Sequence, residues 1–253
     1  MSTRILSVVS MGLLVGSVAA NVSAAPAVYF AEDTSTTQTV VGSNSLTERN
    51  QFLSGLTGVG NENFEAPDQV AGSTAPINLT FPGALTATLN GSGCVDTTIG
   101  VTGQCGTGGA GSNPGRWATS GTQFWEVDSS GSFNITFGAA ISAFGFYGTD
   151  IGDFDGRLRI TLTAENGVET VLDVNHTQGI SNDANSLLFW GFIDTATAYK
   201  MITFSDTTGT GDDIFAFDDM VIGSRQQITV PEPATLALLG IGLAGLGFSR
   251  RKQ

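Results

Sequence analysis

The chain has 253 residues, a formal net charge of −13 at pH 7, 13% charged residues and 34 glycines. Ordinary soluble domains carry about 25% charged residues and about 7% Gly, so charge is scarce here and glycine abundant. The acidic balance argues against a protein that binds nucleic acid or lies on anionic lipid. One His and two Cys leave little material for haem, metal-thiolate or histidine-based catalytic chemistry.

Segment 1–24 has the organisation of a secretory signal peptide. Arg4 supplies the positive start, Ile5 to Ala20 is apolar and uncharged, and small residues precede a predicted cleavage after Ala24. An uncleaved membrane anchor is the alternative, and the short apolar run disfavours it. We therefore expect export through the Sec machinery.

The body, which we define as segment 25–229, is predicted to be a single all-β domain. Alternating apolar and polar residues predict strands at 133–137 and 158–164, and Asn166-Gly167 predicts a hairpin turn into a return strand at 168–174. Further strands are predicted at 77–81, 85–89, 124–127, 141–147, 188–193, 201–205 and 214–222. Many short strands separated by Gly, Asp and Asn predict an antiparallel, jelly-roll-like β-sandwich.

One helix is predicted near the start of the body. Ser45 and Glu48 fit a capping box, and an apolar stripe then runs up to about Gly55. The stripe consists of Leu46, Phe52, Leu53 and Leu56.

Cys94 and Cys105 flank ten residues in a Gly- and Thr-rich stretch. In an exported protein two cysteines at this spacing most simply form one disulfide, which would contribute on the order of 2–3 kcal/mol in the chain-entropy model. A reactive thiol or a metal pair is the alternative, and no neighbouring His or third Cys supports it.

The C-terminal segment 230–253 combines a proline box, fifteen uncharged residues at 234–248 and a basic tail. Fifteen helical residues rise about 22 Å against a hydrocarbon core of about 30 Å, so the segment is predicted to be a short membrane span whose basic end stays cytoplasmic. The box is Pro231, Glu232 and Pro233, and the tail contains Arg250, Arg251 and Lys252. An ordinary tail anchor would share this topology and lack the box.

This order of parts resembles the PEP-CTERM sorting signal of Gram-negative bacteria. The resemblance implies processing by an exosortase, a membrane transpeptidase. The chain would be anchored transiently in the inner membrane and would then reach the cell surface or the extracellular space.

The body also resembles PEP-CTERM proteins of unknown activity. The shared pieces are Glu62–Glu65, Thr119–Thr122 with Trp125, Ala143–Phe154 and Phe217–Met220. This resemblance implies an exported surface or matrix protein and no reaction. The closing strand is also similar to the last strand of carbohydrate-binding jelly rolls.

The first candidate calcium ligands are Asp150, Asp153 and Asp155, which share one loop. Crowded carboxylate oxygens suit Ca²⁺, which takes about 6–8 oxygen ligands. The alternative, a metal-free acidic surface whose Asp residues form turns, is ranked ahead of calcium.

A second acidic cluster runs into the closing strand. Strand alternation sends Asp218 and Asp219 to opposite faces, so one of them is predicted to point inward and to need a cation, an Arg or backbone donors. By resemblance to carbohydrate-binding jelly rolls, Glu65 and Asp219 would share a structural calcium.

Trp117 is the favoured candidate for stacking on a sugar, because it follows Arg116 in a Gly-rich loop. Most Trp and Phe side chains are predicted to lie in the core. His176 has no accompanying Gly-x-Ser-x-Gly motif and is predicted to be a turn residue. No pair of carboxylates stands out for glycosidase chemistry, so we expect no enzymatic activity.

These features predict a non-catalytic exported protein of the cell surface or extracellular matrix, structural or adhesive in a biofilm, with exopolysaccharide as a candidate partner. A calcium-stabilised carbohydrate-binding module is the alternative, and a secreted glycosidase ranks third.

Overall fold

The computed structural model describes residues 25–34, 38–82, 85–97, 105, 115–152, 154–179, 186–208 and 213–229. The predicted signal peptide, the proline box, the 234–248 span and the basic tail lie outside these residues. Within the described ranges, no helix has both the length and the apolar character needed to cross a membrane.

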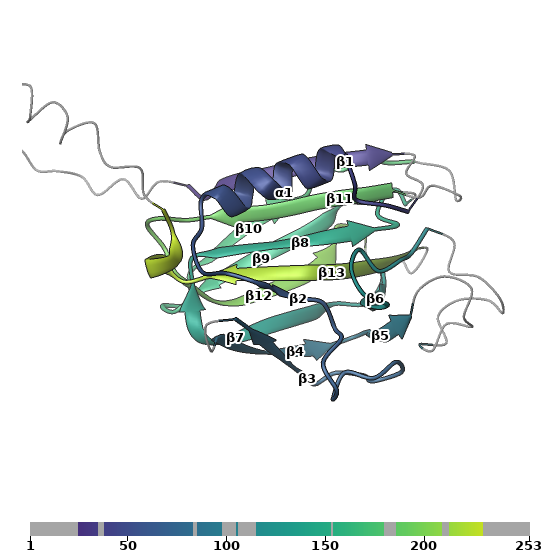
Figure 1. The fold of residues 1–253 in the computed structure, drawn as a ribbon, viewed down its shortest axis with the longest axis horizontal. Helices are drawn as coiled ribbons and strands as arrows, with labels where there is room; N and C mark the ends of the chain where they lie inside the picture. The colour runs from purple at the N-terminus through teal and green to yellow at the C-terminus, as the bar shows by residue number, and fades with distance from the viewer. Residues whose placement is uncertain are drawn as a thin grey trace, which may run out of the picture.

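The described strands form two antiparallel sheets that pack face to face (Figure 1). The seven-stranded sheet has the order β1 (Ala27–Thr34), β11 (Ser186–Ile193), β8 (Ala143–Thr149), β13 (Ile214–Gly223), β6 (Gln123–Asp128) and β5 (Cys94–Thr97), and β2 (Asn61–Glu62) also pairs with β13. The six-stranded sheet has the order β10 (Glu169–Asp173), β9 (Leu158–Ala164), β12 (Tyr199–Asp206), β7 (Phe133–Ile141), β4 (Leu85–Gly91) and β3 (Ile77–Phe81). The predicted all-β sandwich is confirmed.

Aromatic side chains from the inner faces of both sheets fill the space between them. The Phe133 and Phe204 rings of the six-stranded sheet stack at 4.3 Å, and Phe217 of the other sheet packs on both. Alternation in β7 and β12 explains this placement, because Phe133 and Phe204 are buried while the residues next to them in each strand are more exposed.

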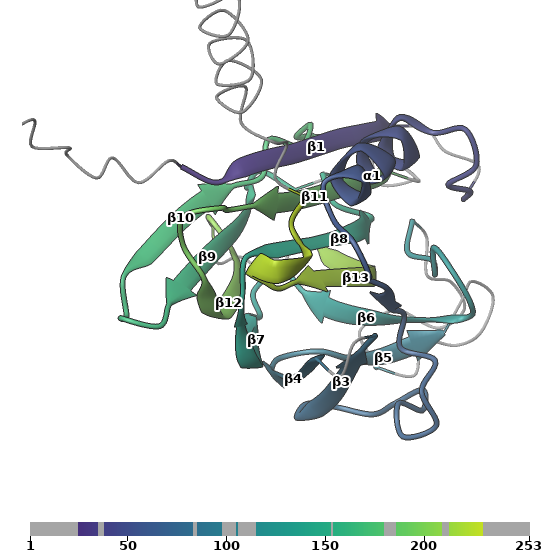
Figure 2. The same cartoon turned by 60° about the vertical axis from the view of Figure 1, so that its left-hand side comes forward.

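Helix α1 (Asn44–Ser54) covers the outer face of the seven-stranded sheet and leaves the six-stranded sheet uncovered (Figures 1 and 2). Phe52 is fully buried beneath it and lies 5.5 Å from Phe189 of β11. Because α1 covers this outer face, β8 and β11 are buried on both sides along their whole length.

The predicted capping box is wrong. Ser43 is the N-cap, and its hydroxyl accepts from the Leu46 amide at 3.0 Å. Ser45 lies inside the first turn, and its hydroxyl donates to the Asp33 carboxylate at 2.6 Å. The side chain that the local motif assigned to the cap therefore makes a tertiary contact instead. The predicted helix end at Gly55 is confirmed.

Ten strands were predicted and are present, with ends that differ by a few residues at most. Strands β1, β2 and β5 were missed. β1 is an edge strand with a half-buried rather than an alternating pattern, and β2 and β5 are only two and four residues long. A short 3₁₀ helix, η1 (Arg225–Gln227), follows β13.

Candidate functional site

The outer face of the six-stranded sheet carries rows of small polar side chains. We call it the threonine face and define it by the outward residues of β3, β4, β7, β12 and β9, namely Asn78, Thr80, Thr86, Thr88, Asn90, Asn134, Thr136, Gly138, Met201, Thr203, Ser205, Thr161 and Thr163. Threonine is a good strand former, so these residues also explain why the sheet forms.

Strand register aligns these side chains across the sheet. Asn78, Thr88, Thr136, Met201 and Thr163 lie side by side in one row. A second row contains Asn90, Asn134, Thr203 and Thr161. Neighbouring strands are about 4.8 Å apart, and rows two residues apart are separated by about 6.7 Å. The face is therefore a regular array of hydroxyl and amide groups.

Most of these groups have no protein partner. Among the described residues, the hydroxyls of Thr86, Thr88 and Thr203 form no hydrogen bond, whereas the Thr136 hydroxyl lies 3.4 Å from the Asn134 side-chain oxygen. A hydroxyl both donates and accepts, so the array offers both functions to a molecule lying on it.

The charged outward residue on these strands is Arg159 of β9, which lies beside Ser205 at one end of the threonine face, and the residues named above are uncharged. Arg159 pairs with Asp173 of β10 at 2.7 Å. The ammonium group of Lys200 donates to the Gly138 carbonyl at 3.1 Å. Glu169 of β10 is exposed at the end of the first row.

A hollow of about 300 Å³ interrupts the face over β3, β4 and β7. It is lined by Asn78, Leu79, Thr80, Thr86, Ala87, Thr88, Thr136, Phe137 and Gly138. A β-bulge lies next to it, where residues 137–140 of β7 stand opposite Lys200 alone. Two residues of this bulge, Phe137 and Gly138, also line the hollow.

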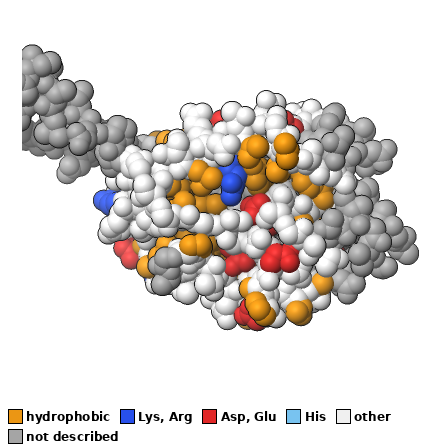
Figure 3. All heavy atoms as spheres, in the orientation of Figure 1, with side chains coloured by type: hydrophobic (Ala, Val, Ile, Leu, Met, Phe, Trp, Pro, Cys, Tyr) orange, Lys and Arg blue, Asp and Glu red, His pale blue; other side chains and the backbone are white. Residues whose placement is uncertain are grey.

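The helix-covered side of the molecule has a different chemistry. Figure 3 shows hydrophobic, acidic and basic side chains together on that face. There the loop from Thr119 to Gln123 is held by three carboxylates. Asp218 accepts from the Thr119 amide at 2.7 Å, and Glu65 accepts from the Gln123 amide at 2.7 Å.

Asp218 and Asp219 lie at a bulge in β13, where the register with β8 shifts. Asp219 has a φ of 48°, which is rare for a residue other than glycine, and its carboxylate accepts from the hydroxyls of Thr119 at 2.9 Å and Ser120 at 2.7 Å. Burial and the neighbouring Asp219 charge raise the pKa of Asp218 well above its ordinary value. Both carboxylates turn toward the loop, so the predicted strict alternation does not hold at this bulge.

Trp117, the candidate for stacking on a sugar, is a core residue. Trp117 is only 3% exposed, so its ring cannot stack on a sugar, and the expectation placed on it is wrong. Tyr147, with the Arg49 guanidinium 5.5 Å from its ring centre, is also buried, and burial raises the pKa of its hydroxyl to about 12. The Trp117 backbone amide donates to the Thr149 hydroxyl of β8 at 3.3 Å.

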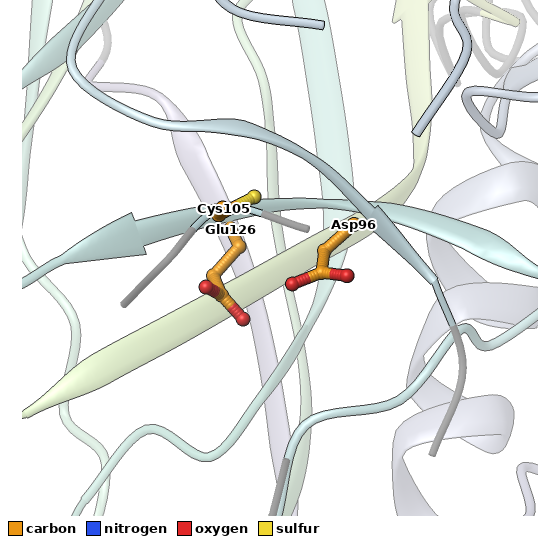
Figure 4. Close-up of side chains that lie close together, drawn as sticks. All are labelled: Asp96, Cys105 and Glu126. Atoms are coloured by element: carbon orange, nitrogen blue, oxygen red, sulfur yellow. The ribbon is translucent and has the colours of Figure 1, made fainter. Parts of the chain in front are cut away.

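Cys94 and Cys105 form the predicted disulfide, with their Cα atoms 5.7 Å apart. Figure 4 shows Cys105 beside the buried side chains of Asp96 and Glu126, whose potential ligand atoms lie within 4.8 Å of one another and of the sulfur. The sulfur belongs to the disulfide and is not a thiolate, and Arg116 pairs with Glu126 at 2.9 Å. The cluster therefore lacks the ligand chemistry of a metal centre.

The described calcium candidates are spread over separate contacts. Asp150 pairs with Arg116 at 3.1 Å, and Asp155 is exposed in the following loop. Asp153 lies outside the described residues. Glu65 and Asp219 bind different parts of the 119–123 loop, and these four described carboxylates do not form a group of three ligand atoms within 4.8 Å. The calcium site stays a prediction.

His176 is a buried structural residue. One ring nitrogen, Nε2, accepts from the Leu158 amide at 3.1 Å, and the other lies 3.0 Å from the Thr177 carbonyl. Burial lowers the pKa of the imidazole, which favours the neutral form with the proton on Nδ1.

Residues 229–252 match the PEP-CTERM protein-sorting motif. The match includes the predicted proline box and the basic tail and confirms the sorting signal. The chain is therefore an exported protein marked for exosortase-mediated sorting toward the cell surface. No curated protein matches the chain.

Several carbohydrate-binding modules resemble the sandwich. The family 29 module CBM29-2 is 12% identical, with coverage of 68% of this chain and 96% of the module and a TM-score of 0.33. The C-terminal family 22 module of Clostridium thermocellum Xyn10B is 11% identical, with coverage of 70% and 97% and a TM-score of 0.33. TmCBM61, solved in complex with beta-1,4-galactotriose, is 11% identical, with coverage of 64% and 98% and a TM-score of 0.31. Similarity at this level concerns the sandwich architecture and does not extend to ligands.

Proposed function

We propose that the body is a non-catalytic adhesive component of the cell surface or extracellular matrix that contacts polysaccharide through the threonine face. The observation that carries this proposal is the array itself, in which aligned hydroxyl and amide groups on neighbouring strands have few protein partners. A polysaccharide presents the complementary groups, because each of its hydroxyls also donates and accepts. The sorting signal supports the proposal by sending the chain to the compartment where such polymers lie.

The arrangement of the carboxylates supports the non-catalytic part. A glycosidase needs two carboxyl groups on either side of the scissile bond, about 5–10 Å apart. Asp218 and Asp219 instead follow each other in one strand and are covered by Thr119 and Ser120. Substrate has no access between them, so we propose a binding role without hydrolysis.

Retention of the purified full-length protein on the producer's own exopolysaccharide tests the binding role. Thr136→Glu places a charge in the middle of the array, and we expect it to lower retention at least about tenfold, as for loss of about 1.4 kcal/mol of binding free energy. Thr47→Glu is the matched control, because Thr47 is an exposed threonine on α1, which covers the other sheet. Equal loss in both variants, or no retention of the parent, would contradict the proposed contact surface.

The adhesive role is tested in cells. Deleting the gene should reduce aggregation or biofilm while leaving the hydrolase activities of the culture unchanged. Complementation with the Thr136→Glu variant should fail to restore aggregation, and complementation with Thr47→Glu should restore it. A deletion strain that aggregates normally and has lost a glycan hydrolase activity would overturn the proposal in favour of an enzyme.

A further inference from the structure

We infer that the hollow over β3, β4 and β7 is the main sugar-binding subsite and that it takes a neutral polysaccharide rather than an acidic one. This inference rests on the proposed function and adds a location and a ligand class to it. The hollow stands out because its lining combines side chains from three neighbouring strands of the threonine face.

Gly138 is the first observation that points to a ligand there. Glycine weakens the interior of a strand and often marks a place where a ligand or another backbone approaches closely. Gly138 does not need a positive φ, and the three atoms nearest to a Cβ at this position all belong to Thr86, the nearest being its hydroxyl oxygen at 2.8 Å. The glycine therefore lets β7 and Thr86 approach closely in the lining of the hollow, and a larger residue here would crowd it.

The lining groups have the chemistry of sugar recognition. The side chains of Asn78, Thr80, Thr86 and Thr88 form no hydrogen bond to another described residue, and each can donate or accept. Binding sites for small molecules begin at about 300 Å³, which is the size of this hollow and fits a short segment of a glycan chain. With the described aromatic rings of Trp117, Trp125 and Trp190 buried, affinity has to come from hydrogen bonds in the hollow.

Charge decides between neutral and acidic polymers. The body carries 22 acidic and six basic residues, so its field repels a polyanion. Lys200 is the basic group beside the hollow, and its ammonium group is engaged by the Gly138 carbonyl at 3.1 Å. Arg159 is engaged by Asp173 across the sheet. Asp173 therefore balances the Arg159 charge, whereas Lys200 keeps its positive charge and is the one group beside the hollow that the test must vary.

The test compares binding of the purified full-length protein to a neutral β-glucan, a neutral mannan and alginate, in low and in high salt. We expect retention on a neutral polymer that does not change with salt, and no retention on alginate in low salt. Because the loss of two neutral hydrogen bonds weakens binding about tenfold, the double variant Asn78→Ala/Thr88→Val should lose about that factor. The double variant Thr161→Val/Thr203→Val, on the same face outside the hollow, should weaken binding less than the hollow variant. The matched double variant Thr47→Val/Asn50→Ala, at exposed positions of α1, should bind like the parent.

Gly138→Val provides a second, independent variant, because its side chain fills the hollow and should also weaken binding at least tenfold. Its melting temperature is compared with that of the parent. If this variant does not fold, the double variant at Asn78 and Thr88 carries the test, since both side chains face solvent and their replacement leaves the core intact.

The outcomes separate the inference from the proposed function. Retention on alginate that is lost in high salt and in Lys200→Gln would overturn the neutral ligand class and leave the polysaccharide contact standing. Neutral binding that survives the hollow variants but is lost in Thr161→Val/Thr203→Val would overturn the location. Absence of binding to every polysaccharide, including the producer's own, would overturn both the inference and the proposed function.

Discussion

Asp218 and Asp219 place two carboxylates next to each other beneath the loop that contains Thr119 and Ser120. A buried charge is costly unless it is paired or hydrogen-bonded, and in the described part of the chain neither carboxylate forms an ion pair with a basic side chain. Backbone amides and hydroxyls satisfy them instead. The sequence argument sent only one of the two carboxylates inward, whereas both turn toward the loop, and backbone and hydroxyl donors are their partners.

The raised pKa of Asp218 makes stability depend on pH in a defined direction. Because the folded-state pKa lies above the ordinary value of 3.8, the folded state binds more protons than the unfolded state between these two values. The free energy of unfolding contributed by this group is therefore highest below about pH 4 and falls as pH rises through the folded-state pKa. Asp218→Asn removes this titration, so we expect the free energy of unfolding of the variant to fall less between pH 4 and pH 8 than that of the parent.

Denaturant unfolding at several pH values measures this difference. Asp155→Asn is the matched control, because it removes the same carboxylate charge at an exposed loop position. If the free energy of unfolding changes with pH in the same way in the parent and in Asp218→Asn, the pKa of Asp218 is not raised in the folded state.

At the scale of elements, β5 is an edge strand that pairs with β6 along four residues. The Cys94–Cys105 disulfide ties this short strand to a residue eleven positions further on. Pairing alone gives a short edge strand little stability, so we expect the disulfide to stabilise this edge of the sheet.

Replacing both cysteines by alanine should lower the free energy of unfolding by about 2–3 kcal/mol, because the unfolded chain regains the entropy of the open loop. Thermal or denaturant unfolding of the double variant measures the loss. Treating the parent with a reducing agent should produce the same loss, and the variant should not respond to the reagent. A double variant as stable as the oxidised parent would mean that the cross-link is structurally dispensable.

Prediction from sequence succeeded where a strand has one buried face. In β3 and β9 the alternation of burial follows the alternation of residue types, and their bounds were predicted without error. It was incomplete where tertiary structure decides. The strands β8, β11 and β13 were predicted, but their burial on both faces was not, because it depends on α1 and the 119–123 loop, which cover them. The predicted capping box was wrong because Ser45 bonds to Asp33 of β1 and not to its own helix end.

The candidate site shows the same limit. Sequence alternation predicts that each threonine of the array faces outward from its strand, but it does not predict which threonines lie side by side. The row from Asn78 through Thr136 to Thr163 exists only because β3, β4, β7, β12 and β9 pair in this order and register. A glycine within a strand, such as Gly138, is a signal that sequence offers. Its place in the hollow depends on the neighbouring Thr86 and on the bulge beside Lys200, which the sequence does not show.

At the scale of the whole molecule, the two outer faces differ in chemistry. One is covered by α1 and by loops whose contacts are made by carboxylates, and the other is an uncharged array open to solvent. Many copies of an exported protein side by side would bind a polymer at several points at once, and such multivalency raises avidity even when each contact is weak. A weak single site is therefore compatible with strong adhesion of a surface coated with this protein.

The calcium prediction also belongs to this scale, because its ligands come from distant parts of the chain. Glu65 follows β2, Asp219 lies in β13, and Asp150 follows β8, yet each of these carboxylates already accepts hydrogen bonds or an ion pair from the 115–123 segment. A calcium ion would have to displace those donors, so we expect the melting temperature to be the same in millimolar calcium and in EDTA. Differential scanning calorimetry of the purified full-length protein measures both. A melting temperature that rises in calcium, with the rise absent in Glu65→Gln and Asp219→Asn but kept in Asp155→Asn, would instead establish a calcium ion shared by Glu65 and Asp219 and show that the 119–123 loop rearranges to admit it.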